Sequence, residues 1–144
     1  MLAFKQTRDT QSSTYQDSLM IRRLVFIEEQ NVPEDIEIDE NEAACLHVVA
    51  YQNDKAVATA RLYQLDDKSF KVQRVAVLAE ERGKHYGNHL LLALEQAGKE
   101  LGGERFILGA QSYAIPFYEK LGYVINSDEY LEAGISHYDM EKRL

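Results

Sequence analysis

A basic, glycine-containing segment stands directly before the most apolar helical stretch of the sequence: residues 82–87 read RGKHYG, and LLLALEQ follows shortly after. Free N–H groups at the start of a helix, together with the helix dipole, attract anions. Gly83 and Gly87 permit a left-handed backbone and close approach of a ligand. Arg82 and Lys84 can add charge-assisted hydrogen bonds. The segment therefore predicts a site for a phosphate or pyrophosphate.

These residues alone leave a second interpretation open, which is a solvated basic helix start whose glycines only form a turn. Neither of the common phosphate-binding patterns, GxxxxGK[ST] and GxGxxG, occurs in the chain. A dinucleotide-binding fold would also begin with parallel βαβ units, whereas three strand-like segments joined by short turns come first here.

A pair of carboxylates ends an otherwise apolar stretch, LVFIEEQ, and one of the two, Glu28 or Glu29, is expected to face inward. A buried carboxylate needs a partner or a catalytic role. Arg61 and Arg74 each stand in an apolar strand and are the candidate partners. Both a structural ion pair and a base in the reaction remain open for these carboxylates.

Two histidines and an acidic run are further candidates for a substrate site. His47 alternates with apolar neighbours, and His137 does the same in the last strand, so each is expected to be exposed or hydrogen-bonded rather than a base. The acidic segment 35–40, which contains Asp39, is most simply solvated, although it can also steer a cationic substrate. The four histidines and single cysteine show no metal-ligand spacing, so no metal is expected.

The composition describes one ordinary globular domain of 144 residues, with 45% apolar and 28% charged side chains. The 24 acidic residues outnumber the 16 basic ones, and a net charge of −8 argues against a nucleic-acid partner. A lone cysteine, Cys45, excludes an intrachain disulfide and fits a cytoplasmic location. The sequence has neither an apolar run of membrane-spanning length nor a signal-peptide pattern, so no membrane partner is expected.

The first half of the chain predicts a helix followed by an antiparallel meander. Ser12 to Thr14 can cap a helix whose apolar face is expected to carry Met20, Leu24 and Ile27, with Ile21 and Val25 beside them. Strands are predicted at LHVVAY, AVATARLY and FKVQRVAV, with turn-prone residues between them. In the third strand the apolar residues Phe70 and Val72 point to one face, whereas the spacing of Val75 and Val77 would place them on the other face. The switch predicts either a β-bulge between residues 73 and 77 or a strand end buried on both faces.

The second half alternates helices and strands. A helix from Tyr86 carries Leu90, Leu94, Ala97 and Leu101 at helical spacing. The strand RFILGA follows this helical crossover and is therefore expected to run parallel to FKVQRVAV. A short helix, AIPFYEKL, and two strands, YVI and ISHYDMEK, complete a mixed α/β sheet.

Three of these segments together resemble the GNAT superfamily of acetyl-CoA-dependent N-acyltransferases. Residues 82–87 resemble that family's loop, Arg/Gln-x-x-Gly-x-Gly/Ala, with His85 in place of the first glycine. RVAV resembles the bulged strand that holds pantetheine, and AIPFYEKLGY resembles the signature A-x-x-F-Y-x-x-x-G-F/Y. Within the superfamily, VFIEEQNVPEDIEID and GAQSYAIPFYEKLGY are similar to the small bacterial ElaA/YjcF-like branch.

The resemblance implies one GNAT-like domain over residues 1–144, with a mainly antiparallel twisted sheet, flanking helices and a splayed central strand pair. It implies acetyl-CoA as co-substrate and direct attack by a primary amine of a small-molecule or peptide acceptor, without a covalent enzyme intermediate. The enzyme would be an N-acetyltransferase, and a homodimer is one assembly that the sequence allows. Two alternatives remain open: a non-catalytic CoA-sensing domain, favoured by His85, and an acyl-homoserine-lactone-synthase-like enzyme.

The resemblance suggests the roles of Tyr118 and of the cofactor-binding loop and strand, whereas the carboxylates and histidines are candidates because of their own chemistry. Tyr118, in FYEKLGY, is the expected acid that protonates the leaving thiolate, and Glu28 and Glu29 are the candidates for the base. Asp39, His47 and His137 are the candidates for binding the acceptor. The expected cofactor-binding residues are Val75, Ala76, Val77, Arg82, Gly83, Lys84, His85, Tyr86, Gly87, Asn88 and Gln111.

Overall fold

One twisted sheet organises the fold, and two of its neighbouring strands run parallel and then separate. The computed structural model describes residues 2–144, in which eight strands are ordered β1-β2-β3-β4-β5-β8-β6, with β7 also paired to β8. The strands are β1 (Leu2–Thr7), β2 (Leu46–Gln52), β3 (Lys55–Gln64), β4 (Ser69–Val77), β5 (Arg105–Gln111), β6 (Val124–Ile125), β7 (Tyr130–Glu132) and β8 (Ile135–Arg143). The predicted mixed, mainly antiparallel α/β sheet is confirmed.

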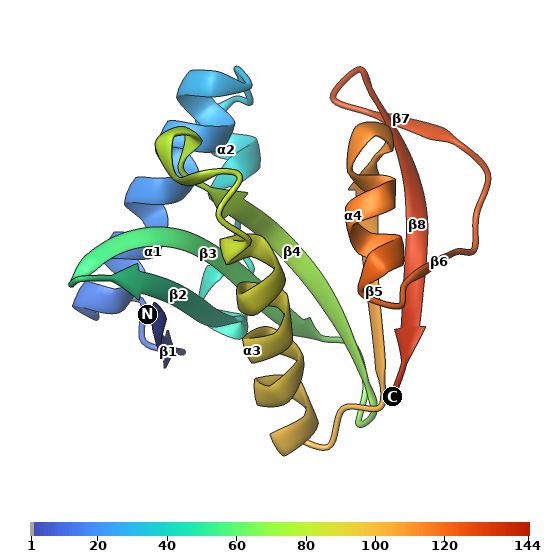
Figure 1. Cartoon of the computed structure of the whole chain (residues 1–144), viewed down its shortest axis with the longest axis horizontal. Helices are drawn as coiled ribbons and strands as arrows, with labels where there is room; N and C mark the ends of the chain where they lie inside the picture. The colour runs from blue at the N-terminus through green and yellow to red at the C-terminus, as the bar shows by residue number, and fades with distance from the viewer. Residues whose placement is uncertain (1) are drawn as a thin grey trace.

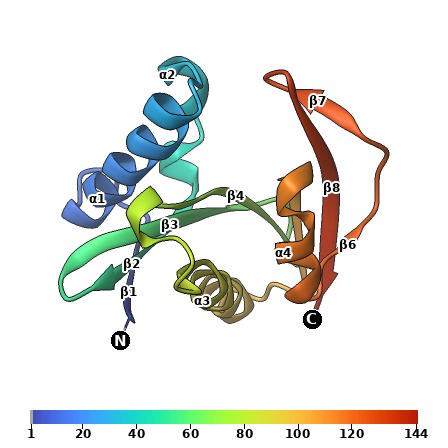
Figure 2. The same cartoon turned by 45° about the horizontal axis from the view of Figure 1, so that its top comes forward.

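The helices cover both faces of this sheet. They are α1 (Ser13–Arg22), the π-helix η1 (Arg23–Glu29), α2 (Glu34–Glu37), α3 (Tyr86–Glu100) and α4 (Ile115–Lys120), with short 3₁₀ turns η2 (Glu42–Ala44), η3 (Ala79–Glu81) and η4 (Ser112–Ala114). Figures 1 and 2 show α1 and α3 on opposite faces of the arm formed by β1 to β4. The second arm carries α4 against β5 and β8.

The two arms join through a short parallel pairing. β4 and β5 are paired only from Ser69↔Arg105 to Lys71↔Ile107, and beyond this point they diverge. The sheet is therefore V-shaped, closed near the C-terminus and open at the other end (Figure 1). The predicted parallel direction is confirmed, and the splay leaves a space bounded by both arms.

β4 contains the irregularity that the parity switch predicts. Its register against β3 shifts between Thr59↔Ala76 and Arg61↔Gln73, so that two residues of β4 oppose one of β3. Arg74, inside the shift, has φ of +57°. Phe70, Val72, Val75 and Val77 all contact one core cluster in spite of their different parity, whereas Ala76 belongs to another. The extra residue of a β-bulge produces this switch of faces.

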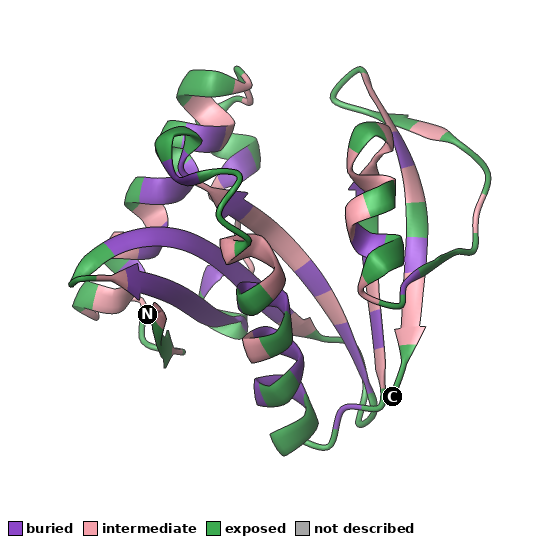
Figure 3. Ribbon diagram, in the orientation of Figure 1, coloured by how far each residue is buried: buried purple, intermediate pink, exposed green. Residues whose placement is uncertain are grey.

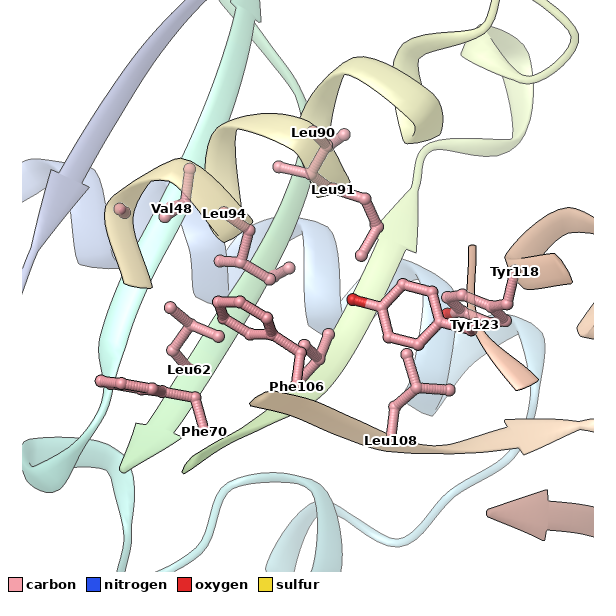
Figure 4. Packing of buried hydrophobic residues seen from close by; sticks show 14 of the residues in the cluster. Val48, Leu62, Phe70, Leu90, Leu91, Leu94, Phe106, Leu108, Tyr118 and Tyr123 are labelled. Carbon is pink, nitrogen blue, oxygen red and sulfur yellow. The ribbon is translucent and has the colours of Figure 1, made fainter. Parts of the chain in front are cut away.

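The larger core cluster lies between α3, α4 and the sheet. Figure 3 shows buried segments on α3 and on the central strands. Leu90 and Leu94 of α3 are fully buried against strand residues such as Leu62 and Phe106 (Figure 4). Leu101 lies just beyond the helix and is exposed, so the predicted apolar face ends one turn earlier. This core holds the two arms at their angle.

The buried side of α1 and η1 includes only part of the predicted apolar face, since Ile21 and Val25 are buried as expected. Met20 and Leu24 are 40% and 42% exposed, whereas Ile21 is fully buried. The buried side also carries Ser18 and Arg22, whose polar groups are hydrogen-bonded to distant parts of the chain. Because two polar residues belong to the true inward face, the apolar spacing in the sequence centred the predicted face on the wrong residues, Met20 and Leu24.

Two strands were not predicted. β1 has an almost fully exposed burial pattern at one edge of the sheet, and therefore shows no apolar alternation. β7 has only three residues, which is too short for a periodicity. Both segments form strands because they pair with a longer neighbour: β1 pairs with β2, and β7 forms a hairpin with β8.

Candidate functional site

A cavity of about 570 Å³ opens where β4 and β5 separate, a size typical of a small-molecule site. Its walls come from both arms and from η1 and α2. The lining includes Phe26, Gln30, Ile36, Glu37, Lys71, Val72, Gln73, Arg74, Val75, Gly109, Gln111, Tyr113, Tyr118, Tyr130, Glu132, His137 and Asp139. Val75, Gln111, Tyr118 and His137, which lie far apart in the sequence, are thus brought together as candidate site residues.

The basic loop leads from β4, part of which lines the cavity, into α3. His85 is the residue before the helix and has φ of +64°, and its side chain makes no capping hydrogen bond. It therefore holds the left-handed conformation for which the family pattern uses glycine, at a conformational cost of about 1 kcal/mol or more. Gly83 also has a positive φ, of +83°, as expected. The first amides of α3 are left available to a ligand.

Gly87 serves a different purpose from the expected one. It is absent from the positive-φ residues of the described chain, so it supplies no left-handed turn. A Cβ at this position would lie 3.2 Å from Phe117 Cζ and 3.8 Å from a methyl group of Val77. Gly87 thus allows the start of α3 to approach α4 closely, next to Tyr118. Tyr86 and Asn88, its neighbours, are half-buried.

The two cations of the loop are engaged with carboxylates. Arg82 donates from Nη1 and Nη2 to the carboxylate of Glu29 at 2.7 and 2.8 Å, and from Nε to the Val77 carbonyl. Lys84 Nζ lies 3.0 Å from Glu81 Oε1. Arg82 and Glu29 are about two-fifths exposed, so an anionic ligand can replace this pairing at little cost.

The expectation that Glu28 or Glu29 faces inward is wrong. Both are exposed, and neither lines the cavity. The hydrogen bonds from Arg82 hold the pKa of Glu29 below its usual value, which makes it a weaker base. Glu28 and Glu29 lie at the end of the π-helix η1, where the N–H of Gln30 donates to the carbonyl of Val25, five residues earlier. This wide turn places Phe26 and Gln30 on the cavity side instead.

Two of the four acids in segment 35–40, Glu37 and Asp39, belong to an ion-pair network, whereas Asp35 and Glu40 are exposed as expected of a solvated run. Arg22 and Arg61 are each 1% exposed, and both donate to Glu42, at 2.7 and 2.8 Å. Arg22 also pairs with Glu37 at 2.7 Å, and Arg61 with Asp39 at 2.9 Å. The partners predicted for Arg61 were Glu28 and Glu29, and the true partners are these carboxylates. Glu42 was missed, because a buried acid is indistinguishable from a solvated one in an acidic run.

Arg74 extends this network to the bulge of β4. Its Nε lies 3.1 Å from Glu37 Oε1, and its Nη2 lies 3.2 Å from Asp39 Oδ2. Burial raises the pKa of Glu37. Burial acts in the same direction on Glu42, but the hydrogen bonds and charges of the arginines outweigh it and lower the pKa of Glu42 to about 2. The network therefore fixes α2, one wall of the cavity, against the bulged strand.

Asp39 and His47, two of the predicted acceptor-binding residues, do not line the cavity. Asp39 is half-buried, is held by two arginines and does not line the cavity. His47 is fully buried: its Nε2 lies 2.8 Å from the Glu42 carbonyl, and its Nδ1 has no hydrogen-bond partner among the described residues. The prediction that His47 contacts substrate is therefore wrong.

Tyr118 presents a hydroxyl without a protein partner among residues 2–144. The residue is 8% exposed, lines the cavity and packs edge-to-face on Phe117 and Tyr123. Figure 4 shows Tyr118 beside Tyr123 in the core. Burial raises the pKa of its phenol well above the usual value. The phenol therefore keeps its proton at ordinary pH and can donate it to a group bound in the cavity.

A family model described as "Acetyltransferase (GNAT) domain" matches residues 12–144. The chain belongs to the GNAT acetyltransferase family. It is 42% identical over 127 residues to the Bacillus subtilis protein described as "Uncharacterized N-acetyltransferase YjcF", covering 88% of this chain and 90% of that one. It is 32% identical over 130 residues to Escherichia coli ElaA, covering 88% of this chain and 85% of that protein.

Solved GNAT structures share the fold over the whole chain. The crystal structure of Escherichia coli ElaA superposes with a TM-score of 0.87 at 27% identity, covering 99% of this chain and 100% of ElaA. A GNAT family acetyltransferase from Elizabethkingia anophelis with acetyl-CoA bound superposes with a TM-score of 0.75 at 15% identity, covering 99% and 98%. The predicted resemblance to the GNAT superfamily and to its ElaA/YjcF-like branch is confirmed.

Two further features of this GNAT protein concern what it lacks. In the part of the chain that the structure describes, His, Cys, Asp and Glu form no group of three or more that could hold a metal ion. Its longest helices are also too short or too polar to cross a lipid bilayer, as judged for residues 2–144.

Proposed function

We propose that this GNAT protein transfers an acetyl group from acetyl-CoA to a primary amine of a small-molecule or peptide acceptor. The observation that carries the proposal is the cavity between the diverging strands β4 and β5, into which Tyr118 presents a buried phenol without a protein partner. The fold shared with a GNAT acetyltransferase that contains acetyl-CoA supports the choice of co-substrate.

The cofactor would run from the loop before α3 to the cavity. Its pyrophosphate would bind the first amides of α3 after the left-handed turn at Gly83 and His85. Arg82 and Lys84 would exchange their present carboxylate partners for phosphate. The pantetheine amides would bond to backbone groups that the bulge at Arg74 and Val75 leaves unpaired.

The reaction proposed is a direct transfer. The neutral amine nitrogen attacks the thioester carbonyl carbon and loses one proton to a base or to water, the C–S bond breaks, and the departing sulfur takes the proton of Tyr118. The phenol then regains a proton from solvent. Cys45, the single thiol of the chain, is fully buried and does not line the cavity, so it is not placed to form an acyl-enzyme.

The departure from the family pattern at His85 does not favour a sensor that binds CoA without catalysis. With φ of +64°, this residue takes the same left-handed conformation that a glycine would take. The loop therefore keeps the backbone direction that presents its amides. The free phenol in the cavity also has no evident use in a protein that only binds the cofactor.

Two measurements test the proposal in sequence. Calorimetric titration with acetyl-CoA should give one site per chain, and a screen of primary amines with thiol release as the readout should then give turnover with at least one class. Binding without turnover across amines, amino acids and peptides would indicate a sensor. Failure to bind acetyl-CoA would refute the proposal altogether.

A further inference from the structure

His137 lines the cavity from strand β8 of the second arm. In the sheet it is paired with Gln111 of β5 on one side and with Tyr130 of β7 on the other. The ring of Tyr130 stacks on its imidazole with the centroids 5.7 Å apart and the planes at 21°. His137 is 7% exposed, and it lines the cavity. One face of its ring is thus covered by the ring of Tyr130.

The hydrogen bonding of this imidazole defines its neutral tautomer. Nδ1 lies 2.7 Å from the carbonyl oxygen of Ile135. A carbonyl oxygen can only accept a hydrogen bond, so Nδ1 must carry the hydrogen. In the neutral ring Nε2 is then unprotonated and has a free lone pair. The neighbour of Nε2 is the carboxylate of Glu132, at 3.7 Å, which is beyond hydrogen-bonding distance but close enough to stabilise a positive charge.

Tyr118 and His137 reach the cavity from opposite faces of the second arm. Tyr118 belongs to the core cluster that contains Leu108 and Ala110 of β5, on the face covered by α4. His137 is the register partner of Gln111, which has the opposite parity in β5 and therefore points to the other face. The phenol and the imidazole thus approach the gap between β4 and β5 from its two sides.

A direct acetyl transfer needs an acid on one side of the reacting atoms and a base on the other. The thioester sulfur must meet an acid, and the incoming amine must meet a base, while the bond forms between them. We propose that His137 Nε2 is the general base that takes the proton of the attacking amine, and this inference rests on the function proposed above. As the N–C bond forms and the C–S bond breaks, the amine proton passes to Nε2 directly or through one water. Tyr118 supplies the proton for sulfur, and the imidazolium later releases its proton to solvent.

The charges around His137 suit this role. Glu132 on β7 and Asp139 on β8 lie on its own wall, and the hydroxyl of Tyr130 donates to Asp139 at 2.7 Å. Across the cavity stand Lys71 and the Arg74–Glu37 pair. The carboxylate of Glu132, 3.7 Å from Nε2, would stabilise the imidazolium formed during transfer.

The first test replaces His137 by Gln in the full chain and uses the amine identified in the screen. At pH 7 and saturating acetyl-CoA, kcat should fall by about 10² to 10⁴, while the Kd for acetyl-CoA and the melting temperature stay near the wild-type values. The loss should shrink as the pH approaches about 10, because a Lys-like amine is then increasingly neutral and needs no base. His89, which is exposed on α3, provides the control: His89→Gln should behave as wild type throughout.

The outcomes separate this inference from the function on which it rests. Equal kcat in wild type and His137→Gln would overturn the role of His137 and leave the acetyltransferase intact. A loss that is the same at pH 7 and pH 10 would mean a structural role. Nitrogen NMR of the histidine rings gives a test independent of any acceptor, since a hydrogen on Nε2 instead of Nδ1 would exclude the proposed base. Absence of turnover by the wild type would remove the proposed function and the base together.

Discussion

Arg22 and Glu42 form a buried, bidentate ion pair, with Arg22 Nη1 at 2.7 Å from Glu42 Oε1 and Nη2 at 2.9 Å from Oε2. The other side of the carboxylate is held by Arg61 at 2.8 Å. The pair ties α1 to the segment before β2, and through Glu37 it also fixes α2. Since α2 contributes a wall of the cavity, a network of buried charges positions part of the candidate active site.

This network predicts an acid-dependent loss of stability that Glu42→Gln should reduce. The pKa of Glu42 is lowered from 4.5 to about 2 in the folded protein, so its charge stabilises the fold above pH 4.5 and the gain is lost as the pH falls toward 2. The contribution is about 3 kcal/mol at 1.36 kcal/mol per pKa unit. At pH 7 the variant should unfold with a free energy lower by about 3 to 5 kcal/mol.

Urea denaturation from pH 7 to pH 2 checks this prediction. The gap in unfolding free energy between wild type and Glu42→Gln should be widest above pH 5 and should close toward pH 2. Glu40 is exposed two residues away, and Glu40→Gln should change stability by no more than about 0.5 kcal/mol. A gap that is independent of pH would contradict the lowered pKa.

Tyr118→Phe should reduce the rate and leave the fold intact. The phenyl ring keeps its contacts with Phe117 and Tyr123, and no hydrogen bond to another described residue is lost. If the phenol protonates the thiolate, kcat at saturating acetyl-CoA should fall by about 10² to 10⁴, with the Kd for acetyl-CoA near normal. A decrease in kcat of less than tenfold would mean that solvent protonates the leaving thiolate or that the thiolate leaves without protonation.

The neighbouring Tyr123 supplies the matched control. Its hydroxyl is buried and donates to Glu95 Oε2 at 2.8 Å. Tyr123→Phe should therefore lower the unfolding free energy by about 1 to 3 kcal/mol and leave kcat largely unchanged. The two variants remove the same atom from adjacent rings and are expected to separate a catalytic hydroxyl from a structural one.

His85→Asp and His85→Asn form a pair that tests the anion site at the start of α3. Asn and Asp have the same shape and both tolerate the left-handed conformation found at this position. Only Asp adds a negative charge where the pyrophosphate would lie, so Asp should weaken acetyl-CoA binding about tenfold or more relative to Asn. Calorimetry at low and high salt measures the difference, which should narrow as salt screens the charge. Equal affinities at low salt would remove this loop from the cofactor site.

Deletion of Arg74 tests the bulge. Without this residue Phe70, Val72, Val75 and Val77 would alternate strictly, so β4 could pair regularly with β3 and keep its apolar face. The deletion should fold and bind acetyl-CoA at least tenfold more weakly, because fewer backbone groups of β4 remain free. Arg74→Gly keeps the extra residue, whose φ is +57°, and removes the same ion pairs. Comparable affinities in the two variants would show that the bulge does not hold the cofactor.

Local patterns in the sequence were sufficient for most of the fold. The meander, the parallel return after α3 and the bulge in β4 were predicted because each leaves a short-range signature: period-two alternation, a helical crossover and a change of parity. The cap of α1 was also correct, since the Ser12 hydroxyl accepts from the Tyr15 amide. The motifs at residues 82–87 and 114–123 were specific enough to predict the family.

The sequence by itself therefore determined the family, the order of most elements and the candidate acid, Tyr118. The tertiary structure decided which carboxylates pair with the arginines, which side of α1 is buried and which tautomer His137 adopts. These features depend on partners distant in the chain, such as Arg22 with Glu37 at a separation of 15 residues and Arg74 with Asp39 at 35. A charged residue has the same appearance in a sequence whether it is solvated or paired, because only the folded chain brings its partner within hydrogen-bonding distance.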